Sequence, residues 1–446
     1  MRLLYQQEKQ PSMEDGFARL LCTGDLHLGR HPTRIPDRLD GAECSPRSVW
    51  QDIVREAIDR DVDAVVLTGD IADRENRYFE AYGAFEAGVI DLNDAGILVV
   101  TVAGNHDSEF LPRMVDDIGL DSLHLLGAGG TWERWSLEQN GDTVVHFDGW
   151  SFPQPHVSSS PIDSYDLPEA EDAPQVGVLH AELDSPRSQY APVDGSELRN
   201  KPGACWLLGH IHVPGIRIES DPTTLYPGSP QPLDPGERGM HGPWIVTISS
   251  EGTIDAEQIP LGTVCYEEFE IDVSEAADPK AVGADVSTAI QEHVQTDLET
   301  RNIEAFLPRV RLTGRTPAHT QLVEEKQTLE EQLATRQDTV DIHVESIAVE
   351  TRPDVDLDAL AEGDGPVAYL AELLVTLEDT EADTECTQLI DEAQDAMQEA
   401  HSAGAYNLLL RESEVESPGR DAAIEMIEQE ARVLLDTLLQ QKGEHP

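Results

Sequence analysis

Cysteine, lysine and long apolar runs are scarce in this 446-residue chain, and each scarcity excludes a class of protein. The five cysteines are odd in number and form no Cys-x-x-Cys pair, so neither a disulfide framework nor a zinc finger is expected. No apolar run reaches the roughly 18 residues that cross a bilayer, and the first residues lack the apolar stretch of a signal peptide. We therefore expect a soluble protein of the reducing cytoplasm, without contact to membranes.

Basic residues are scarce as well, because 30 lysines and arginines stand against 87 acidic residues and give a net charge of −57. Only five of the basic residues are lysine. Such a surface argues against general attraction to nucleic acid. An acidic coat with little lysine is nevertheless typical of proteins from a halophile, where salt screens the self-repulsion. An acidic surface that binds a partner is the alternative. We interpret the charge as a sign of habitat, which leaves the activity open.

Short apolar segments alternate with amphipathic ones in the first part of the chain. Strands are expected at residues 17–23, 64–67 and 97–102, and helices at 48–60 and 78–95. This alternation predicts a parallel sheet that is covered on both faces. Three further buried strands are expected at residues 176–179, 205–208 and 244–248.

The composition changes along the rest of the chain. Residues 151–174 are rich in Pro, Ser and Asp and predict a long surface loop, whereas the Pro/Gly-dense residues 221–243 predict an ordered, irregular segment near a site. From residue 262 onward, strands are expected near 265–274, 307–312 and 340–350, and helices at 281–298 and 320–337. An amphipathic helix follows at 420–440, with its stripe formed by Ile424, Ile427, Ala431, Leu434, Leu435 and Leu438. We expect an N-terminal tail (1–16) and three domains (17–260, 261–352 and 353–446).

Polar residues of the types that bind metals follow five of the expected strands. They occur in the motifs GDLH, GD, GNHD and GHIH and as one isolated histidine: Asp25, His27, Asp70, Asn105, His106, His180, His210 and His212. Because sites in α/β sheets form at the carboxyl ends of strands, we expect these side chains to converge on one rim. A glycine before most of them allows the backbone to turn tightly. Each motif alone is more often a simple turn, but five in this order favour a site.

The residue types define the chemistry of that site. Imidazoles, carboxylates and one amide oxygen are sufficient to hold two divalent metal ions, with Asp70 as the bridging ligand. Mixed nitrogen and oxygen ligands suit Mn, Fe or Zn better than Mg or Ca. Two such ions lower the pKa of a bridging water and hold both the attacking and the leaving oxygen of a phosphoester.

Together these motifs resemble those of the calcineurin-like metallophosphoesterase superfamily over residues 17 to about 260. The resemblance implies an α/β sandwich of mixed sheets flanked by helices. It also implies that His106 contacts the scissile phosphate and assists the leaving oxygen, while Asp107 orients the His106 imidazole. The implied ligands are Asp25, His27, Asp70 and His212 for one metal, and Asp70, Asn105, His180 and His210 for the other.

Three further stretches, GDLHLGR (24–30), YPGSPQPL (226–233) and PRVRLTGRT (308–316), resemble those of SbcD-type DNA-repair exonucleases and their YhaO-like branch. This resemblance implies a small α+β cap, a helical C-terminus, DNA as substrate, a homodimer and an SMC-like ATPase of the SbcC type as partner. The chain departs from the family at Asp73, where many archaeal and eukaryotic members have histidine, and in the looser GERGMHG stretch (236–242).

Arginines close to the first motif are candidates for contact with a substrate. Arg30 and Arg34, followed by Arg38 and Arg47, either form salt bridges to Asp37, Asp40 and Glu43 or bind phosphates of DNA. The same two interpretations apply to Arg309, Arg311 and Arg315. The histidines outside the motifs are expected to have structural or surface roles: His31, His124, His146, His156 and His241.

These observations predict a Mn-dependent, two-metal DNA-repair nuclease, acting as exonuclease or endonuclease, in which a metal-bound hydroxide attacks the phosphodiester. A metallophosphatase or cyclic-nucleotide phosphodiesterase of the same superfamily is one alternative. A non-catalytic metal-binding scaffold for the ATPase is another. The chain has no GxxxxGK[ST] motif, so we do not expect it to hydrolyse ATP itself.

Overall fold

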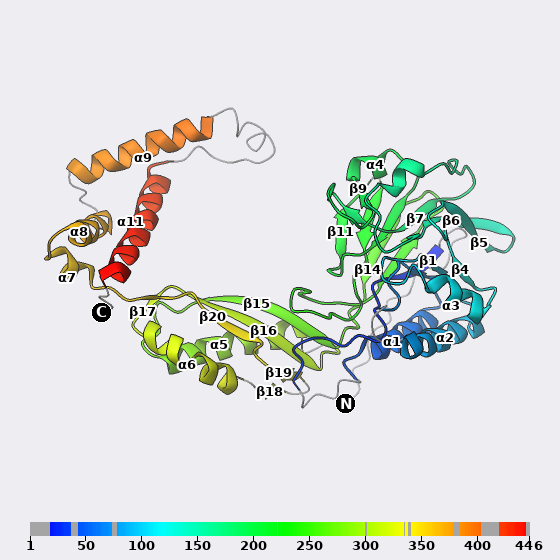
Figure 1. The fold of residues 1–446 in the computed structure, drawn as a ribbon, viewed down its shortest axis with the longest axis horizontal. Helices are drawn as coiled ribbons and strands as arrows, with labels where there is room; N and C mark the ends of the chain where they lie inside the picture. Colours follow the sequence, from blue (N-terminus) through cyan, green and yellow to red (C-terminus); the bar gives the residue numbers. More distant parts are fainter. Residues whose placement is uncertain are drawn as a thin grey trace. The chain divides into compact units, whose positions relative to one another are not determined.

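A computed structural model describes residues 18–36, 43–73, 78–220, 222–298, 301–333, 335–337, 340–378, 384–402 and 419–442 (Figure 1). The expected N-terminal tail (1–16) and Arg38 lie outside the described residues. The chain divides into two compact units. The first comprises Met1–Ile271, Gly283–Leu312 and Lys326–Ala348, and the second Asp272–Val282, Thr313–Glu325 and Val349–Pro446. The expected domain boundaries remain predictions.

A six-stranded mixed sheet forms one layer of the first unit. Its order is β14-β13-β1-β2-β3-β4. Strands β1 to β4 run parallel, β13 is antiparallel to β1, and β14 is antiparallel to β13. The parallel strands are nearly continuous apolar runs because both faces of the sheet are covered. Their bounds are β1 (Ala18–Thr23), β2 (Ala64–Leu67), β3 (Leu98–Thr101), β4 (Leu123–Leu125), β13 (Trp244–Ile248) and β14 (Ile254–Gln258).

Helices α1 (Pro46–Asp59) and α2 (Tyr78–Asp94) pack on one face of this sheet, and α3 (Leu111–Ile118) follows β3 (Figure 1). Helix α1 begins after Ser45, whose hydroxyl accepts a hydrogen bond from the Ser48 amide at 3.3 Å. Trp50 of α1 stacks on Phe85 of α2 within the same apolar cluster as Val65 and Val99 of the sheet. Amphipathic helices therefore cover this face, as the sequence predicts.

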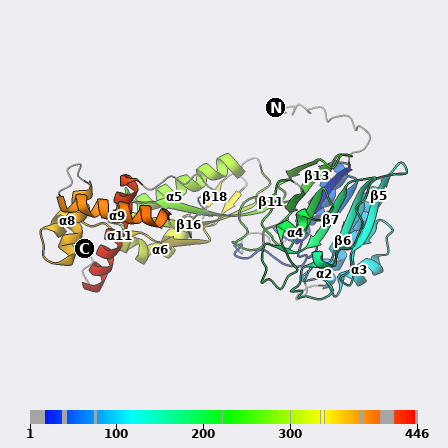
Figure 2. The ribbon, with the colours of Figure 1, turned by 90° about the horizontal axis from the view of Figure 1, so that it is seen from above.

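A second six-stranded sheet, with the order β11-β12-β10-β7-β6-β5, covers the opposite face (Figure 2). Apolar residues of both sheets, such as Val66, Val100, Val178 and Leu207, form one core between the layers. The fold is therefore an α/β sandwich of mixed sheets, as the resemblance implies, and the motif strands are divided between its two sheets. The bounds are β5 (Glu133–Gln139), β6 (Asp142–Trp150), β7 (Gln175–His180), β10 (Cys205–Gly209), β11 (Gly215–Ile218) and β12 (Thr223–Tyr226).

The expected surface loop at 151–174 is in part buried. It contains a 3-10 turn (Pro161–Ser164), and Phe152, Ile162 and Tyr165 pack on the outer face of the second sheet. The Tyr165 hydroxyl donates a hydrogen bond of 2.6 Å to Asp148, which anchors the segment. Three short elements follow: β8 (Glu182–Leu183), β9 (Pro192–Val193) and α4 (Gly195–Arg199).

A smaller sheet, with the order β15-β16-β19-β18 and with β20 paired to β16, follows the sandwich in sequence. The α+β module expected from residue 262 onward is confirmed, although the helix predicted at 320–337 ends at Leu333 and the strand predicted at 340–350 is two short strands. The bounds are β15 (Val264–Asp272), α5 (Pro279–His293), β16 (Ala305–Thr313), α6 (His319–Leu333), β18 (Thr335–Gln337), β19 (Val340–Ile342) and β20 (Ser346–Val349), with a π-helical turn at Val294–Leu298.

The second unit is mainly helical where it is described. Helix α11 (Arg420–Lys442) buries Ala423, Ile427, Ala431 and Leu435, spaced four residues apart, in two apolar clusters shared with α8 and α9. Leu434 is 53% exposed, so its predicted place in the stripe was wrong. The other bounds are β17 (Arg315–Thr316), β21 (Arg352–Pro353), α7 (Leu357–Ala361), α8 (Pro366–Glu378) and α9 (Thr384–Ser402).

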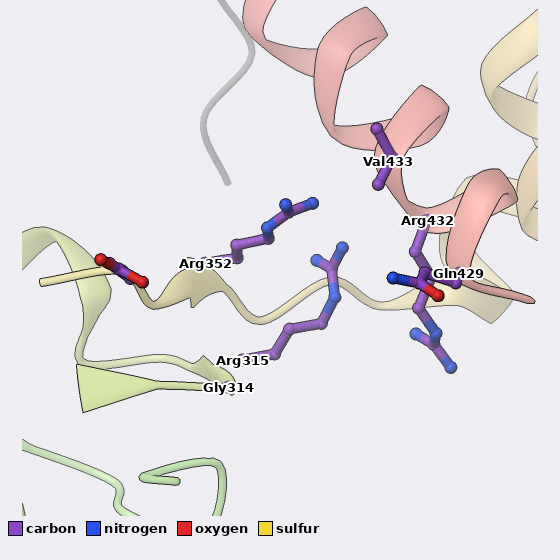
Figure 3. Close-up of a pocket in the computed structure, with 7 residues that line it drawn as sticks. Gly314, Arg315, Arg352, Gln429, Arg432 and Val433 are labelled. Carbon is purple, nitrogen blue, oxygen red and sulfur yellow. The ribbon is translucent and has the colours of Figure 1, made fainter. Parts of the chain in front are cut away.

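Arginines of the β17–β21 pair hold α11 through one acidic side chain. Arg315 donates to both carboxylate oxygens of Asp436 at 2.7 and 2.8 Å, and Arg352 pairs with the same carboxylate. These two arginines also line a cavity of about 260 Å³ with Arg432 and Val433 of α11 (Figure 3). Among the helices described here, none combines the length and apolar character needed to cross a bilayer.

Candidate metal centre

The predicted ligands lie where the carboxyl ends of strands from the two sheets of the sandwich meet. Asp25 and Asp70 follow β1 and β2 of the first sheet, whereas His180 ends β7 of the second. The His27 amide donates to the Asp70 carbonyl at 3.0 Å, which joins the first two motifs through their backbones. The site is therefore formed by two packed sheets and not by the rim of one.

Six of the seven predicted ligands form a compact, largely buried cluster. The Nε2 atoms of His27 and His212 are 3.1 Å apart, and His212 Nε2 lies 3.9 Å from Asp25 Oδ1. His180 Nε2 lies 3.3 Å from Asp70 Oδ2 and 2.9 Å from Asn105 Oδ1. Three sets of described residues, each with ligand atoms within 4.8 Å of one another, could hold a metal ion. Two consist of predicted ligands, namely Asp25, His27 and His212, and Asp25, Asp70 and His180; the third joins His27 to Asp73 and His106.

The donor atoms of this cluster fit divalent cations. The set combines imidazole nitrogens, carboxylates and an amide oxygen, which suits first-row transition metals. The Nε2 atoms of His27 and His212 face each other, and an imidazole that carries its proton on Nδ1 can offer the lone pair of Nε2 to a cation. The backbone also carries strain here, because Asp25, His27, Asp70 and His210 have φ values of 48°, 44°, 50° and 92°. Left-handed non-glycine residues cluster at functional sites, where the surrounding structure offsets their cost.

The charges within the cluster stabilise one another. Burial raises the pKa of the Asp70 carboxyl, but the charge and hydrogen bond of His180, with His27 and His106, hold it well below its usual range. Burial lowers the pKa of His180, but Asp70 raises it to about 9. Burial likewise lowers the pKa of His212, whereas its hydrogen bond to Glu237 and nearby carboxylates raise it to about 9. A divalent cation would replace the protons on these two imidazoles.

Two glycines next to the ligands have different roles. Gly69 has φ 98°, a left-handed conformation that agrees with the predicted tight turn. Gly104 is required for space, since a Cβ there would lie 2.1 Å from Asp70 Oδ1. The glycine of the GNHD motif therefore lets the β3 loop approach the Asp70 carboxylate.

The seventh predicted ligand, His210, lies beside the cluster. Its amide donates to the Asp25 carboxylate at 3.1 and 3.2 Å, while its ring lies 5.3 Å from the His180 ring. Its Nε2 is 3.8 Å from Glu182. Burial and the neighbouring His180 lower the pKa of His210 to about 3, so its ring is neutral. Its role as a ligand remains a prediction.

His106 lies at the open side of the cluster. Its side chain is 40% exposed, its ring packs edge-on 5.1 Å from the His27 ring, and its Nδ1 lies 4.0 Å from Asp73 Oδ2. The His106 amide donates to Asp70 Oδ1 at 2.9 Å. The ring can thus contact a substrate while the backbone of the same residue positions a predicted ligand.

Asp107 differs from the expectation that it orients the His106 ring. Its carboxylate oxygens accept hydrogen bonds from the amides of Ile71 and Gly104, both at 2.7 Å. The carboxylate is fully buried, and burial together with the charge of Asp70 raises its pKa to about 7. Asp107 therefore joins the β2 and β3 loops, because the turn that exposes His106 directs the next side chain inward.

Two acids that the sequence did not assign to the site contact its histidines. Glu237 Oε1 accepts a hydrogen bond of 2.7 Å from His212 Nδ1, and Asp73 Oδ2 lies 3.7 Å from His27 Nδ1. The only signal for them was that both occur where the chain departs from the resembled family. The Thr68 carbonyl occupies the corresponding position at His180, 3.0 Å from Nδ1.

The candidate substrate-binding arginines have acidic neighbours. Arg30 lies 3.6 Å from both Asp73 and Asp234, beside the cluster. Arg34 is 70% exposed and lies 3.5 Å from Glu345. Both arginines therefore lie near acids other than the predicted partners Asp37, Asp40 and Glu43, of which Asp37 and Asp40 lie outside the described residues. Contact with phosphate remains a prediction. The other arginines considered above pair in the same way: Arg309 with Glu345, Arg311 with Glu270, and Arg315 with Asp436.

The histidines outside the motifs have contacts that agree with structural roles. His241 is buried, and its Nδ1 lies 2.7 Å from the Ser229 carbonyl. His146 lies between Ser136 and Asp172, with nitrogen–oxygen distances of 2.7 and 2.9 Å. His124 stacks on Trp135 with ring centroids 4.1 Å apart.

Comparisons with known proteins agree with this geometry. The family described as calcineurin-like phosphoesterase matches residues 18–214, and the middle domain of metallophosphoesterase YhaO matches residues 266–352. An uncharacterized metallophosphoesterase YhaO of Bacillus subtilis is 26% identical over 236 residues, covering 52% of this chain and 56% of its own. The DNA double-strand break repair protein Mre11 of Halobacterium salinarum is 30% identical over 248 residues, covering 54% of this chain and 58% of its own.

The chain spans less than two thirds of the length of each of these relatives. Along the chain, the calcineurin-like phosphoesterase match falls on the sandwich, and the YhaO middle-domain match falls on the smaller sheet that follows it. Over residues 18–214 the chain therefore resembles the calcineurin-like metallophosphoesterases, and it is similar to proteins named YhaO and Mre11.

Proposed function

We propose that this protein is a two-metal, Mn-dependent phosphodiesterase that cleaves DNA during repair. The observation that carries the proposal is the cluster in which His27, His180 and His212 direct Nε2 atoms toward buried carboxylates. DNA as the substrate rests on the similarity to proteins named as DNA double-strand break repair Mre11. An SMC-like ATPase of the SbcC type as partner and a homodimer are what the resemblance to SbcD-type exonucleases implies.

The chain's own residues would divide the reaction among them. Asp25, His27 and His212 would hold one cation, and Asp70, Asn105 and His180 the other, with His210 completing the set. Bound divalent cations supply Lewis acidity to the phosphate and to the attacking water. His106, at the exposed side of the cluster, would donate a proton or a hydrogen bond to the leaving oxygen.

Arg30 is the better placed of the two candidate substrate arginines. Its guanidinium lies 3.6 Å from Asp73, which also lies near His27 and His106, so Arg30 belongs to the rim of the cluster. Arg34 is more exposed and would contact the DNA backbone further from the reacting phosphate. Both would provide the local positive charge that a chain of net charge −57 needs to approach DNA.

The remaining expectations are part of the same proposal. Residues 261–352 would cap the substrate, and residues 353–446 would dock the ATPase. The halophilic origin rests on the charge and the scarcity of lysine. The cytoplasmic setting rests on five buried cysteines, none in a disulfide.

The test is incubation of purified protein with labelled duplex and single-stranded DNA at high KCl, with and without Mn²⁺. Cleavage that requires Mn²⁺ is expected, together with about two metal equivalents per chain by elemental analysis. Turnover of a small phosphomonoester or a cyclic nucleotide without cleavage of DNA would favour the phosphatase or phosphodiesterase alternative. Metal uptake with no hydrolysis of any ester would favour the scaffold.

A further inference from the structure

Glu237 is a buried acid whose two oxygens are both engaged at the metal centre. Its Oε1 accepts the hydrogen bond from His212 Nδ1 at 2.7 Å. Its Oε2 accepts from the Ser229 hydroxyl at 3.0 Å and from the Leu233 amide at 2.8 Å. Only 7% of Glu237 is exposed, and no arginine or lysine is among its hydrogen-bond partners here. A buried carboxylate is costly unless it is paired and hydrogen-bonded, and Glu237 is paired with His212.

The segment around Glu237 also holds His212 by its backbone. The Ser229 amide donates to the His212 carbonyl at 2.9 Å. Gly228 has φ 74°, and a Cβ at that position would lie 2.4 Å from the same carbonyl oxygen. The Pro/Gly-dense stretch after β12 therefore contacts His212 at two points, its carbonyl and its ring.

The hydrogen bond to Glu237 determines which nitrogen of His212 is available to a cation. An ionised carboxylate can only accept, so the proton of a neutral His212 ring resides on Nδ1. Nε2 then carries the lone pair, and it is this atom that lies 3.1 Å from His27 Nε2 and 3.9 Å from Asp25. Carboxylates that bond the second nitrogen of a ligating histidine fix its tautomer and orientation.

We propose that Glu237 is a positioning residue of the metal centre, which holds His212 in the Nε2-directed orientation that a divalent cation requires. This inference rests on the proposed metal-dependent function, but it concerns a residue that neither the motifs nor the expected ligand set contains. The GERGMHG stretch (236–242), although it departs from the family motif, therefore contributes the residue that positions His212.

The substitution Glu237→Gln tests the role with little change in volume. A glutamine offers one acceptor and one donor, so it cannot satisfy both His212 Nδ1 and Leu233 N, which both present N–H groups. Mn²⁺ binding by purified, metal-stripped protein, followed through the electron paramagnetic resonance signal of free Mn²⁺, is expected to weaken about 10- to 100-fold at one site. Glu345→Gln is the matched control, because Glu345 is equally buried but pairs with Arg309.

A double-mutant cycle with His212→Ala separates positioning from general structural support. If Glu237 acts through His212, Glu237→Gln changes Mn²⁺ affinity by less than about twofold in the His212→Ala background. Equal effects in both backgrounds would overturn the inference. Glu237→Asp keeps the charge but shortens the reach, so its affinity should fall as well, and retention of native affinity would contradict the role of the hydrogen bond.

The outcomes distinguish this inference from the proposed function. Mn²⁺ uptake by the native protein with unchanged affinity in Glu237→Gln would overturn only the role of Glu237. No uptake by the native protein would overturn the proposed function and the inference together. Thermal unfolding of each metal-stripped variant identifies any loss of folding, and Glu237→Asp provides the test if Glu237→Gln does not fold.

Discussion

Replacement of His106 by alanine is expected to separate metal binding from hydrolysis. The imidazole is 40% exposed and its nearest acid, Asp73, lies 4.0 Å away. Its main packing contact is the edge-on approach to the His27 ring at 5.1 Å, and such contacts contribute about 0.5–1.5 kcal/mol. The contact that positions Asp70 comes from the His106 amide, which alanine retains. We therefore expect a stability loss of about 1 kcal/mol and an unchanged metal content.

The rate should fall much more than the stability. Loss of a positioned acid costs about 10²- to 10⁴-fold in rate, or about 3–5 kcal/mol in the activation free energy. The effect should depend on the leaving group, because p-nitrophenolate leaves without protonation whereas the alkoxide of DNA does not. His106→Ala should therefore lose more activity on duplex DNA than on bis(p-nitrophenyl) phosphate.

The assay compares turnover of both substrates with Mn²⁺ content determined by elemental analysis on the same preparation. His124→Ala is the control, since His124 stacks on Trp135 and has no contact with the predicted ligands. Native turnover of DNA by His106→Ala would refute the assigned role. Loss of one metal equivalent would show that His106 supports the centre itself. An equal loss on both substrates would indicate stabilisation of phosphate charge rather than proton donation.

Three further perturbations have defined outcomes. Gly104→Ala places a Cβ 2.1 Å from Asp70 Oδ1, so overpacking should lower the free energy of unfolding by about 1–3 kcal/mol and lower Mn²⁺ uptake. Thermal unfolding and metal analysis measure the two effects, and native uptake would contradict the steric argument. Asp436→Asn leaves Arg315 and Arg352 without their shared carboxylate, and should lower the unfolding free energy by about 1–3 kcal/mol while turnover of bis(p-nitrophenyl) phosphate is retained. Chelation should lower the melting temperature, and Mn²⁺ at 100 times its Kd should restore about 2.7 kcal/mol; an unchanged melting temperature would argue against a bound cation.

The sequence predicts six of the twelve strands of the sandwich (β1, β2, β3, β7, β10 and β13), but neither the other six nor the assignment of the strands to two sheets. Strands β7 and β10 are short and wholly buried, like β2, so their hydrophobic pattern is the same in either sheet. Pairing is determined by contacts between distant segments, which apolar runs of this length do not specify. The same limit applies to 151–174, where Pro and Ser suggested a surface loop although Phe152 and Tyr165 are buried.

Six of the predicted ligands gather because their positions depend only on strand ends, which the sequence marks clearly. The supporting contacts are less predictable. Adjacency in GNHD suggested that Asp107 serves His106, but consecutive residues of a turn point in different directions, and the carboxylate meets the Ile71 and Gly104 amides instead. Glu237 is 25 residues from His212 in a segment without periodicity, so only the folded chain reveals their hydrogen bond.

The net charge illustrates a second limit of composition. A net charge of −57 suggests few surfaces that could bind DNA. The candidate DNA-binding arginines Arg30, Arg34 and Arg309 each lie within 4 Å of an acid in the same unit. Ion pairs whose arginine is partly exposed, as in these three, are worth little, and salt weakens them further. High salt should therefore release such arginines from their acidic partners at little cost, while the buried ligand cluster is screened much less. In this protein, salt concentration should alter DNA affinity more than the rate of the chemical step, which a comparison of KM and kcat across KCl concentrations would measure.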